Sequence, residues 1–206
     1  MIHRLPSAWY QLQSAPGSLV AQPNPFEFSM DPEARVTGTF IHRLLEQLHD
    51  VPPEEWSLDQ LHPELWGQRL LQLGLPRDKL HTTIAYALSL IEKMMQDEKA
   101  HWIFSPNHHD RACELSLQLF IGNKPSQMIL DRTFIDEHQI RWIIDFKTAP
   151  MPENEGFLMD EKRQYHKQLH QYAQALEQLG NEKIRCALYY PSFGGWIEWD
   201  YEHDRA

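Results

Sequence analysis

Apolar and polar residues alternate along residues 128–148 in the pattern of two β-strands joined by a short turn. The segment reads MILDRTFIDEHQIRWIIDFKT, and its second half is rich in β-branched and aromatic residues, which favour a buried strand. Turn-prone polar residues around His138 separate the two halves. A hairpin centred at this residue would place Asp131 opposite Asp145, at the spacing of a direct cross-strand pair.

Side chains alternate along a strand, so the second half of this hairpin has one polar face and one apolar face. Asp145 and Lys147 are expected on the same face, while Ile144 and Phe146 point the other way. Like charges placed opposite each other destabilise a sheet, so Asp131 and Asp145 need a compensating charge. A divalent cation would supply this charge, and Lys147 would contribute to it.

Three other segments have the 3.6-residue period of amphipathic helices. The first helix is expected from residue 37 to 49, with Thr37 or Thr39 as a cap at its start. Residues 54–100 read as a series of helices, and residues 160–179 as one further helix. The apolar residues of the first helix follow the i, i+3, i+4, i+7 pattern: Ile41, Leu44, Leu45 and Leu48.

The order of the expected elements predicts the fold class. Besides the hairpin, strands are expected at residues 112–120, 184–190 and 196–199. The chain therefore runs through helices, three successive strands, a helix and two final strands. This order predicts an α/β fold, with a central mixed β-sheet flanked by helices and a helical insertion after the first helix.

The domain organisation follows from the distribution of proline and of periodic segments. Residues 1–36 contain several prolines and no lasting periodicity, which indicates a linker or an arm laid on the domain. Residues 37–206 are expected to form one domain, with the helical insertion at about 54–100. A proline-rich start would also suit a domain that is joined to a further unit upstream.

The composition excludes several classes of protein. The chain has 206 residues and a net charge of −10, which argues against a basic protein that coats DNA but allows a nuclease with a local basic groove. No apolar run approaches the ~20 residues of a membrane span, and the N-terminus lacks the apolar core of a signal peptide. We therefore expect no membrane partner and a cytoplasmic location.

The cysteines and the histidine-rich segment limit the metal sites that the chain can form. Cys113 and Cys186 do not lie in a C-x-x-C pair, so this chain cannot supply four cysteines to an iron–sulfur cluster or a zinc site. Residues 108–110 read His-His-Asp, which could contribute to zinc binding but is better explained as a solvated loop. We expect no iron–sulfur cluster.

Each polar residue that could take part in chemistry also has a purely structural explanation. His42 could be an exposed histidine on a helix surface. Asp131 could form a local ion pair with its neighbour Arg132, and Asp145 could form a same-face salt bridge with Lys147. These explanations account for each residue singly, but they do not account for the order in which the residues occur.

That order is G-T-x-x-H on a helix, E on a strand, D-R, I-I-D-F-K-T, and Q-L-x-x-Y on a helix. The segments are Gly38-Thr39-Phe40-Ile41-His42, Glu114, Asp131-Arg132, Ile143-Ile144-Asp145-Phe146-Lys147-Thr148, and Gln168-Leu169-His170-Gln171-Tyr172 after Tyr165. The order resembles the RecB/AddA-type branch of the PD-(D/E)XK nuclease superfamily over roughly residues 37–190. Members of that branch often have glycine three residues before the aspartate of the D-R pair, where this chain has Met128.

The resemblance implies a restriction-endonuclease-like core and a metal-dependent nuclease site. It implies that His42, Asp131 and Asp145 are metal ligands, together with the carbonyl oxygen of Phe146. It also implies that Lys147 is the catalytic lysine. Carboxylates with one imidazole and no thiolate suit Mg²⁺ or Mn²⁺ rather than structural zinc. Such an ion would lower the pKa of a bound water for attack on a phosphodiester, and Lys147 would offset the charge that develops.

Three further residues complete the expected catalytic set of this resemblance. Gln168 and Tyr172 match the Q-x-x-x-Y motif, which lies close to the catalytic centre and the DNA in that family. Their i, i+4 spacing puts both side chains on one helix face. Glu114 matches a strand glutamate near the site.

The resulting hypothesis is a divalent-metal-dependent DNA nuclease, a phosphodiester hydrolase that acts as an exonuclease on single-stranded or unwound DNA. Branch members without an iron–sulfur cluster are usually fused to a UvrD-like helicase, so we expect DNA and a helicase domain or subunit as partners, in double-strand break repair and recombination. The chain has no G-x-x-x-x-G-K-[ST] loop of its own. Two alternatives remain: a catalytically silent nuclease-like module that binds DNA or protein, and a nuclease that acts on RNA or foreign DNA.

Overall fold

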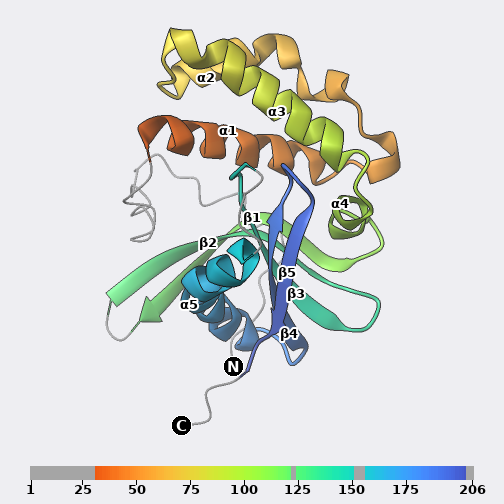
Figure 1. The fold of residues 1–206 in the computed structure, drawn as a ribbon. Helices are drawn as coiled ribbons and strands as arrows, with labels where there is room; N and C mark the ends of the chain where they lie inside the picture. The colour runs from red at the N-terminus through yellow and green to blue at the C-terminus, as the bar shows by residue number, and fades with distance from the viewer. Residues whose placement is uncertain (1–30, 122–123, 151–155, 203–206) are drawn as a thin grey trace.

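The structure is a computed structural model that describes residues 31–121, 124–150 and 156–202, without the side chains of residues 118–121 and 124–126. Its described part contains a five-stranded sheet with helices on both faces (Figure 1). The strands are β1 (His109–Ile121), β2 (Lys124–Ile135), β3 (Ile140–Phe146), β4 (Lys183–Tyr190) and β5 (Gly195–Asp200). The α-helices are α1 (Pro32–Leu48), α2 (Trp66–Gln72), α3 (Leu80–Met94), α4 (Glu98–Ile103) and α5 (Phe157–Glu177). Short 3₁₀ helices are η2 (Pro53–Glu55), η3 (Leu58–Leu61), η4 (Pro63–Leu65) and η5 (Arg77–Lys79).

The sheet is mixed, as its sequence predicts. Its strand order is β1-β2-β3-β4-β5, and the three meandering strands β1, β2 and β3 are antiparallel neighbours. β3 and β4 are parallel, and α5 forms the crossover between them, while β5 returns antiparallel to β4. The predicted α/β fold with a central mixed sheet and flanking helices is confirmed.

The β2–β3 hairpin is centred where the sequence predicts. Arg132 pairs with Ile144 and Phe134 with Trp142, so the centre of the register lies at His138. Asp136 stabilises the turn, because its Oδ1 accepts hydrogen bonds of 2.9 Å from the backbone N–H groups of residues 138 and 140. Its Oδ2 accepts a hydrogen bond of 2.8 Å from the Trp142 indole. One aspartate therefore fixes both the turn and the buried side chain of Trp142.

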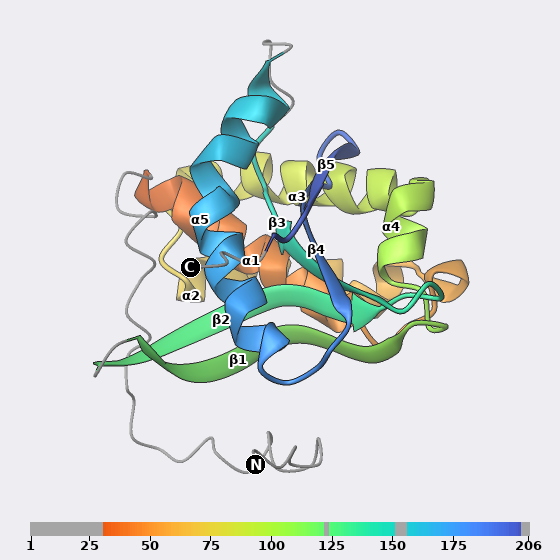
Figure 2. The same cartoon turned by 90° about the horizontal axis from the view of Figure 1, so that it is seen from below.

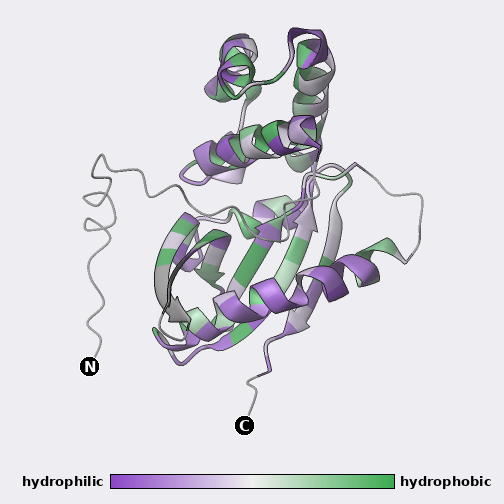
Figure 3. Ribbon diagram, turned by 90° about the vertical axis from the view of Figure 1, so that its left-hand side faces the viewer, coloured by the Kyte–Doolittle hydropathy of each residue, from purple (hydrophilic) through white to green (hydrophobic). Residues whose placement is uncertain are grey.

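Two hydrophobic cores lie on the two faces of the sheet. Helices α1 to α4 cover one face, where Ile144 and Phe146 of β3 are buried against them. Helix α5 covers the other face, where Ile143 and Leu188 pack (Figure 2). The side of α5 that faces away from the sheet is mostly hydrophilic (Figure 3). The alternation along β3 thus separates the two cores as a two-residue period requires.

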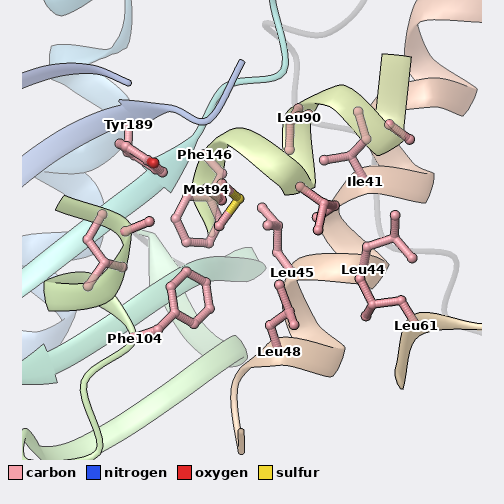
Figure 4. Packing of buried hydrophobic residues seen from close by; sticks show 14 of the residues in the cluster. Ile41, Leu44, Leu45, Leu48, Leu61, Leu90, Met94, Phe104, Phe146 and Tyr189 are labelled. Atoms are coloured by element: carbon pink, nitrogen blue, oxygen red, sulfur yellow. The ribbon is translucent and has the colours of Figure 1, made fainter. Parts of the chain in front are cut away.

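The larger core joins α1 to the sheet through aromatic and aliphatic side chains. The apolar stripe of α1 that the sequence predicts is buried, and Leu45 and Leu48 point toward Phe104 and Phe146 (Figure 4). The rings of Phe104 and Phe146 are stacked, with centroids 5.8 Å apart. This packing holds α1 against the end of β3 that the sequence predicts to bear the site.

Helix α1 begins five residues earlier than the predicted start at residue 37. Pro32 occupies its first turn, and the side chain of Asp31 caps it by accepting a hydrogen bond of 3.2 Å from the Glu33 N–H. Proline is compatible with the first helical turn because the N–H that it lacks would have no intrahelical partner there. The last part of the expected 1–36 arm is therefore helical, and residues 1–30 lie outside the described residues.

The helical segment between α1 and β1 is attached to the backbone beyond β3. The Tyr86 hydroxyl of α3 donates a hydrogen bond of 2.6 Å to the Thr148 carbonyl oxygen. Ser192, in the turn between β4 and β5, donates one of 2.5 Å to the Ala149 carbonyl oxygen and accepts one of 2.8 Å from Lys93 of α3. The two residues that follow Lys147 are thus held from two sides.

The segment at residues 108–110 is only in part the solvated loop that the sequence suggests, because His109 and Asp110 are exposed but lie in a strand. His108 is buried, its ring stacks on Phe134 with centroids 4.0 Å apart, and its Nε2 is hydrogen-bonded to the Trp102 carbonyl oxygen at 2.6 Å. His109 begins β1. The neighbouring tryptophan and phenylalanine explain the difference, since they offer the imidazole an apolar face together with a carbonyl acceptor.

Candidate metal centre and active site

Two carboxylates face each other within the β1–β2 hairpin. Cys113 pairs with Arg132, and the register carried one residue further places Glu114 opposite Asp131. Glu114 has a φ of 49°, in the left-handed region that disfavours residues other than glycine, asparagine and aspartate. Such a backbone conformation persists only where the surrounding structure compensates for its cost.

The hairpin changes direction at this point. Leu130 and Phe134 are four residues apart on β2, so strict alternation would put both on the same face. Instead Phe134 belongs to the core beneath α1 to α4, and Leu130 belongs to the core beneath α5. The strand therefore turns between them, at the position of Asp131, and this turn brings the carboxylates to the boundary between the two cores.

Helix α1 brings an imidazole to the same point. Nδ1 of His42 lies 3.5 Å from Glu114 Oε1 and 3.5 Å from Asp131 Oδ1. One ligand atom from each of the three residues lies within 4.8 Å of the other two, and no other group of three or more such side chains occurs among the described residues. Two oxygen donors and one imidazole nitrogen suit Mg²⁺ or Mn²⁺, so the donor set fits the predicted metal.

The charges of these residues are strongly coupled. Burial alone would lower the pKa of His42, but the carboxylates of Asp131 and Glu114 outweigh it and hold that pKa well above its usual range. Burial would raise the pKa of Asp131, but His42 and the Phe146 N–H outweigh it and lower that pKa. A protonated imidazole thus balances the acids of the metal-free site, and it must lose this proton to bind a metal.

A second polar group lies at the end of β3. Nζ of Lys147 is 2.7 Å from Asp145 Oδ2, and both side chains are largely buried. Burial and the nearby Asp131 together raise the pKa of Asp145 to about 6, against the opposing effect of Lys147. Burial would lower the pKa of Lys147, but Asp145 outweighs it and raises that pKa. The predicted same-face placement of this pair is observed.

Helix α5 covers this pair with one face. Gln168 Nε2 lies 3.4 Å from Asp145 Oδ1 and donates a hydrogen bond of 2.8 Å to the Tyr172 hydroxyl. Tyr165, one turn earlier, places its ring centroid 3.5 Å from Lys147 Nζ. The resemblance includes Tyr165 just before the Q-x-x-x-Y segment but gives it no role. Its i−3 spacing from Gln168 is the signal that places it in the site.

A backbone hydrogen bond links the two groups. The N–H of Phe146, between the acid and the lysine, donates to Asp131 Oδ2 at 2.7 Å. Asp145 lies outside the three-residue metal group, and its carboxylate faces Lys147 and Gln168 instead. Glu114 takes its place in that group. The predictions that Asp145 and the carbonyl oxygen of Phe146 bind the metal remain predictions.

Asp131 does not form the local ion pair with Arg132 that a purely structural explanation offered. The Arg132 side chain is fully buried in the core beneath α1 to α4, where its Nε and Nη2 donate to the Ile103 carbonyl oxygen at 3.2 and 3.0 Å. Its Nη1 donates to His49 Nδ1 at the end of α1, and its guanidinium lies 5.1 Å from the ring of Phe104. Arg132 therefore connects β2, α4 and α1, and two of these elements, α1 and β2, carry residues of the metal group.

Comparisons with known proteins identify a family for this chain. The family model described as the PD-(D/E)XK nuclease superfamily matches residues 10–194. The crystal structure of SSO0001 is 13% identical and covers 82% of this chain and 78% of its own, with a TM-score of 0.35. That of protein VC1899 from Vibrio cholerae is 12% identical and covers 79% of this chain but only 48% of its own, with a TM-score of 0.27. Both TM-scores are too low to establish a shared fold on their own. No curated protein matches the chain significantly.

The mixed sheet, its flanking helices and the acidic group beside a lysine define a nuclease-like α/β domain. The family match spans most of the chain, and the chain belongs to the PD-(D/E)XK nuclease superfamily. Membership implies a nucleic-acid substrate and phosphodiester chemistry. No helix among the residues described is long and apolar enough to cross a membrane.

Proposed function

We propose that this protein is a divalent-metal-dependent deoxyribonuclease of the RecB/AddA type, which acts as an exonuclease on single-stranded or unwound DNA. One observation supports this most directly: an imidazole–carboxylate group lies beside a buried aspartate–lysine pair, and a single hydrogen bond from Phe146 to Asp131 connects them. A structural ion pair needs no such neighbour, whereas a cation site and a positioned ammonium can both promote phosphodiester hydrolysis.

The proposed ligands of the metal are His42, Glu114 and Asp131, with Asp145 and the carbonyl oxygen of Phe146 completing the site. A bound Mg²⁺ or Mn²⁺ would polarise a phosphoryl oxygen and lower the pKa of a water molecule. The Phe146 N–H holds the Asp131 carboxylate in one orientation at 2.7 Å, so that its other oxygen stays directed toward His42.

Lys147 is the proposed catalytic lysine. Its ammonium is fixed between Asp145 and the Tyr165 ring, where it can neutralise charge that develops on the phosphate. Gln168 restrains the other oxygen of Asp145, and Tyr172 accepts the hydrogen bond that orients Gln168. The raised pKa of Lys147 keeps it protonated at neutral pH, so it acts as a positive charge rather than as a base.

The proposed context is double-strand break repair or recombination, together with a helicase domain or subunit. The support is the motif order, which resembles the branch that is usually fused to a UvrD-like helicase. Sequencing the gene and its neighbours tests this part separately. Helicase motifs in frame or in an adjacent gene would support it, and a lone gene without a helicase neighbour would contradict it.

The decisive experiment compares Asp145→Ala and Lys147→Ala with the wild type on end-labelled single-stranded DNA, in Mg²⁺ and in Mn²⁺. Each variant should lose at least about 100-fold of the cleavage rate, because each removes a group expected to act on the reacting phosphate. Lys183→Ala and Asp200→Ala form a matched control, since they disrupt an ion pair of 2.9 Å at the other end of the sheet. Unchanged cleavage in the site variants would contradict the assignment. A folded wild type that cleaves nothing would favour the silent binding module.

A further inference from the structure

The exposed side of α1 bears a row of hydrogen-bond donors. Arg35, Thr39, Arg43 and Gln47 are spaced four residues apart and are all exposed. We call these four residues the α1 ridge. None of them is acidic, in a chain whose net charge is −10. Residues four apart are neighbours on a helix surface, so the ridge is continuous along the helix.

The ridge leads away from the candidate metal centre. At about 100° per residue, its members lie progressively further around the helix from His42, starting with Arg35 and ending with Gln47. Arg43 directly follows His42 in the chain. Thr39 lies three residues before His42, and residues three apart are neighbours on a helix surface. The ridge therefore passes the imidazole at Thr39 and crosses the solvent-exposed side of α1.

The ridge ends at a hollow between α1 and α2. This hollow has a volume of about 250 Å³ and is lined by Phe40, Leu44, Arg43, Gln47 and Arg69. At about 30 Å³ per water molecule, it has room for a phosphate group and its water. Phe40 and Leu44 are buried and form its apolar floor, while the two arginines and the glutamine supply its polar atoms.

The two arginines of this hollow are available to an anion. Within the part of the chain that the structure describes, neither Arg43 nor Arg69 has an ion-pair partner, whereas Arg141, Arg163 and Arg185 pair with carboxylates. A guanidinium has five donors, no acceptor and a fixed fork that matches a phosphate. A hollow with two such groups and no acid among its lining residues selects an anion.

We propose that the α1 ridge and Arg69 bind the sugar–phosphate backbone of the single strand that the candidate site cleaves. A row of repeated donors suits a repeated anion, which a nucleic-acid backbone supplies and a single small anion does not. The strand would enter or leave over α1, with one phosphate held in the hollow by Arg43 and Arg69. This inference rests on the proposed nuclease function and assigns its substrate track.

The test measures binding separately from cleavage. Fluorescence anisotropy with a fluorescein-labelled 20-nucleotide oligothymidine in EDTA gives the dissociation constant between 50 and 200 mM KCl. For single strands each phosphate contact contributes about 0.7 to the slope of log affinity against log salt. Arg43→Gln with Arg69→Gln should therefore weaken binding and make the slope shallower by about 1.4, and Arg43→Gln alone by about 0.7.

The control replaces two exposed lysines outside α1 and α2, Lys167→Gln with Lys183→Gln, and so removes the same charge. It should leave the slope unchanged. A slope that shifts equally in both double variants would overturn the proposal, because only overall charge would then matter. Absence of oligonucleotide binding by the wild type would overturn it as well. If the double arginine variant fails to fold, as judged by circular dichroism, the single variant decides.

Failure of this proposal differs from failure of the nuclease assignment. Suppose that cleavage depends on Asp145 and Lys147 but the arginine variants keep the salt slope of the wild type. The nuclease assignment would then stand, and the proposed strand-binding role of the α1 ridge would be wrong. If binding depends on the α1 ridge but no metal-dependent cleavage occurs, the strand-binding surface would stand and the protein would be a catalytically silent nuclease-like module.

Discussion

Asp131 and Arg132 are neighbours in the chain, and both side chains contact helix α1. The carboxylate lies 3.5 Å from His42 of α1, and the guanidinium donates to His49 near the end of the same helix. Two consecutive residues thus attach β2 to α1 at two points, one in the candidate site and one in the core. The position of His42 over the acids therefore depends on Arg132 as well as on apolar packing.

The His49–Arg132 contact predicts a dependence of stability on pH. Burial and the positive charge of Arg132 lower the pKa of His49 from 6.5 to about 4. The folded state then binds fewer protons than the unfolded state, so the stabilisation is present above pH 6.5 and is lost as the pH falls toward 4. The loss amounts to at most about 3.4 kcal/mol, at 1.36 kcal/mol per pKa unit.

Urea unfolding of the wild type and of His49→Gln between pH 4 and 8 measures this effect. Glutamine can still accept a hydrogen bond from Arg132 but does not titrate, so the variant should lose less stability between pH 7 and 4.5. His62→Gln is a suitable control, because His62 is exposed. Parallel curves for the wild type and His49→Gln would contradict a lowered pKa of His49 in the folded state.

The acidic group predicts stabilisation by divalent ions. Mn²⁺ at 100 times its dissociation constant should stabilise the wild type by about 2.7 kcal/mol, which raises the melting temperature measurably. Asp131→Asn and His42→Ala should abolish most of this rise, while Asp200→Asn should retain it. A melting temperature that does not respond to millimolar Mg²⁺ or Mn²⁺ would rule out the site.

The affinity for the metal should itself depend on pH. The pKa of His42 is raised by Asp131 and Glu114, so the imidazole carries a proton that the metal must displace. Calorimetry should therefore show tighter Mn²⁺ binding and a smaller release of protons as the pH rises. An affinity that is constant from pH 6 to 9 would mean that His42 is not a ligand.

The backbone conformation of Glu114 predicts that glycine at this position gives a more stable protein than alanine. Both Glu114→Ala and Glu114→Gly remove the carboxylate, but only glycine adopts a φ of 49° without strain. The left-handed conformation costs an L-residue about 1–2 kcal/mol, so the glycine variant should be the more stable of the two by about 1 kcal/mol.

Guanidinium unfolding of both variants measures this difference, and the same pair of substitutions at Ser116 is the control. Ser116 is an exposed residue of β1 without positive φ, so glycine should be the less stable substitution there. If alanine were also the better substitution at position 114, the strain at Glu114 would be refuted.

The contact between Tyr165 and Lys147 predicts that the tyrosine ring, and not its hydroxyl, matters for cleavage. Its ring lies 3.5 Å from Lys147 Nζ, and a buried cation–π contact contributes up to about 2 kcal/mol. Tyr165→Phe should retain cleavage within a few-fold, whereas Tyr165→Leu should lose about 10-fold in the single-turnover rate at saturating DNA. A loss confined to DNA affinity, with an unchanged rate, would assign Tyr165 to substrate binding instead.

The sequence predicted the parts of the site that lie on one hairpin. The placement of Asp131, Asp145 and Lys147 needs only the two-residue period of a strand and a turn at His138, and both are local properties. The relation of Gln168 to Tyr172 is local in the same way, because it depends on one helical turn. These contacts could be derived before any tertiary structure was known.

The remaining parts depend on how separate elements pack. The approach of His42 to Glu114 is set by how α1 lies across the sheet, which no periodicity encodes. Glu114 joins the metal group because the hairpin turns at this point. Nothing in the segment Ala-Cys-Glu-Leu predicts a residue with positive φ. The burial of Arg132 was missed because its carbonyl and imidazole acceptors come from elements far away in the sequence.

Tyr86 holds Thr148 directly, and Lys93 holds Ala149 through Ser192. The position of Lys147, the proposed catalytic lysine, therefore depends on the helical segment 54–100. This helical segment contributes no group that acts on the substrate, yet it holds the backbone next to Lys147 in place. Substitutions in this segment can therefore change the cleavage rate while the proposed metal ligands stay the same. Substitutions at Tyr86 would then slow the chemical step, although Tyr86 itself contributes no group to the candidate site.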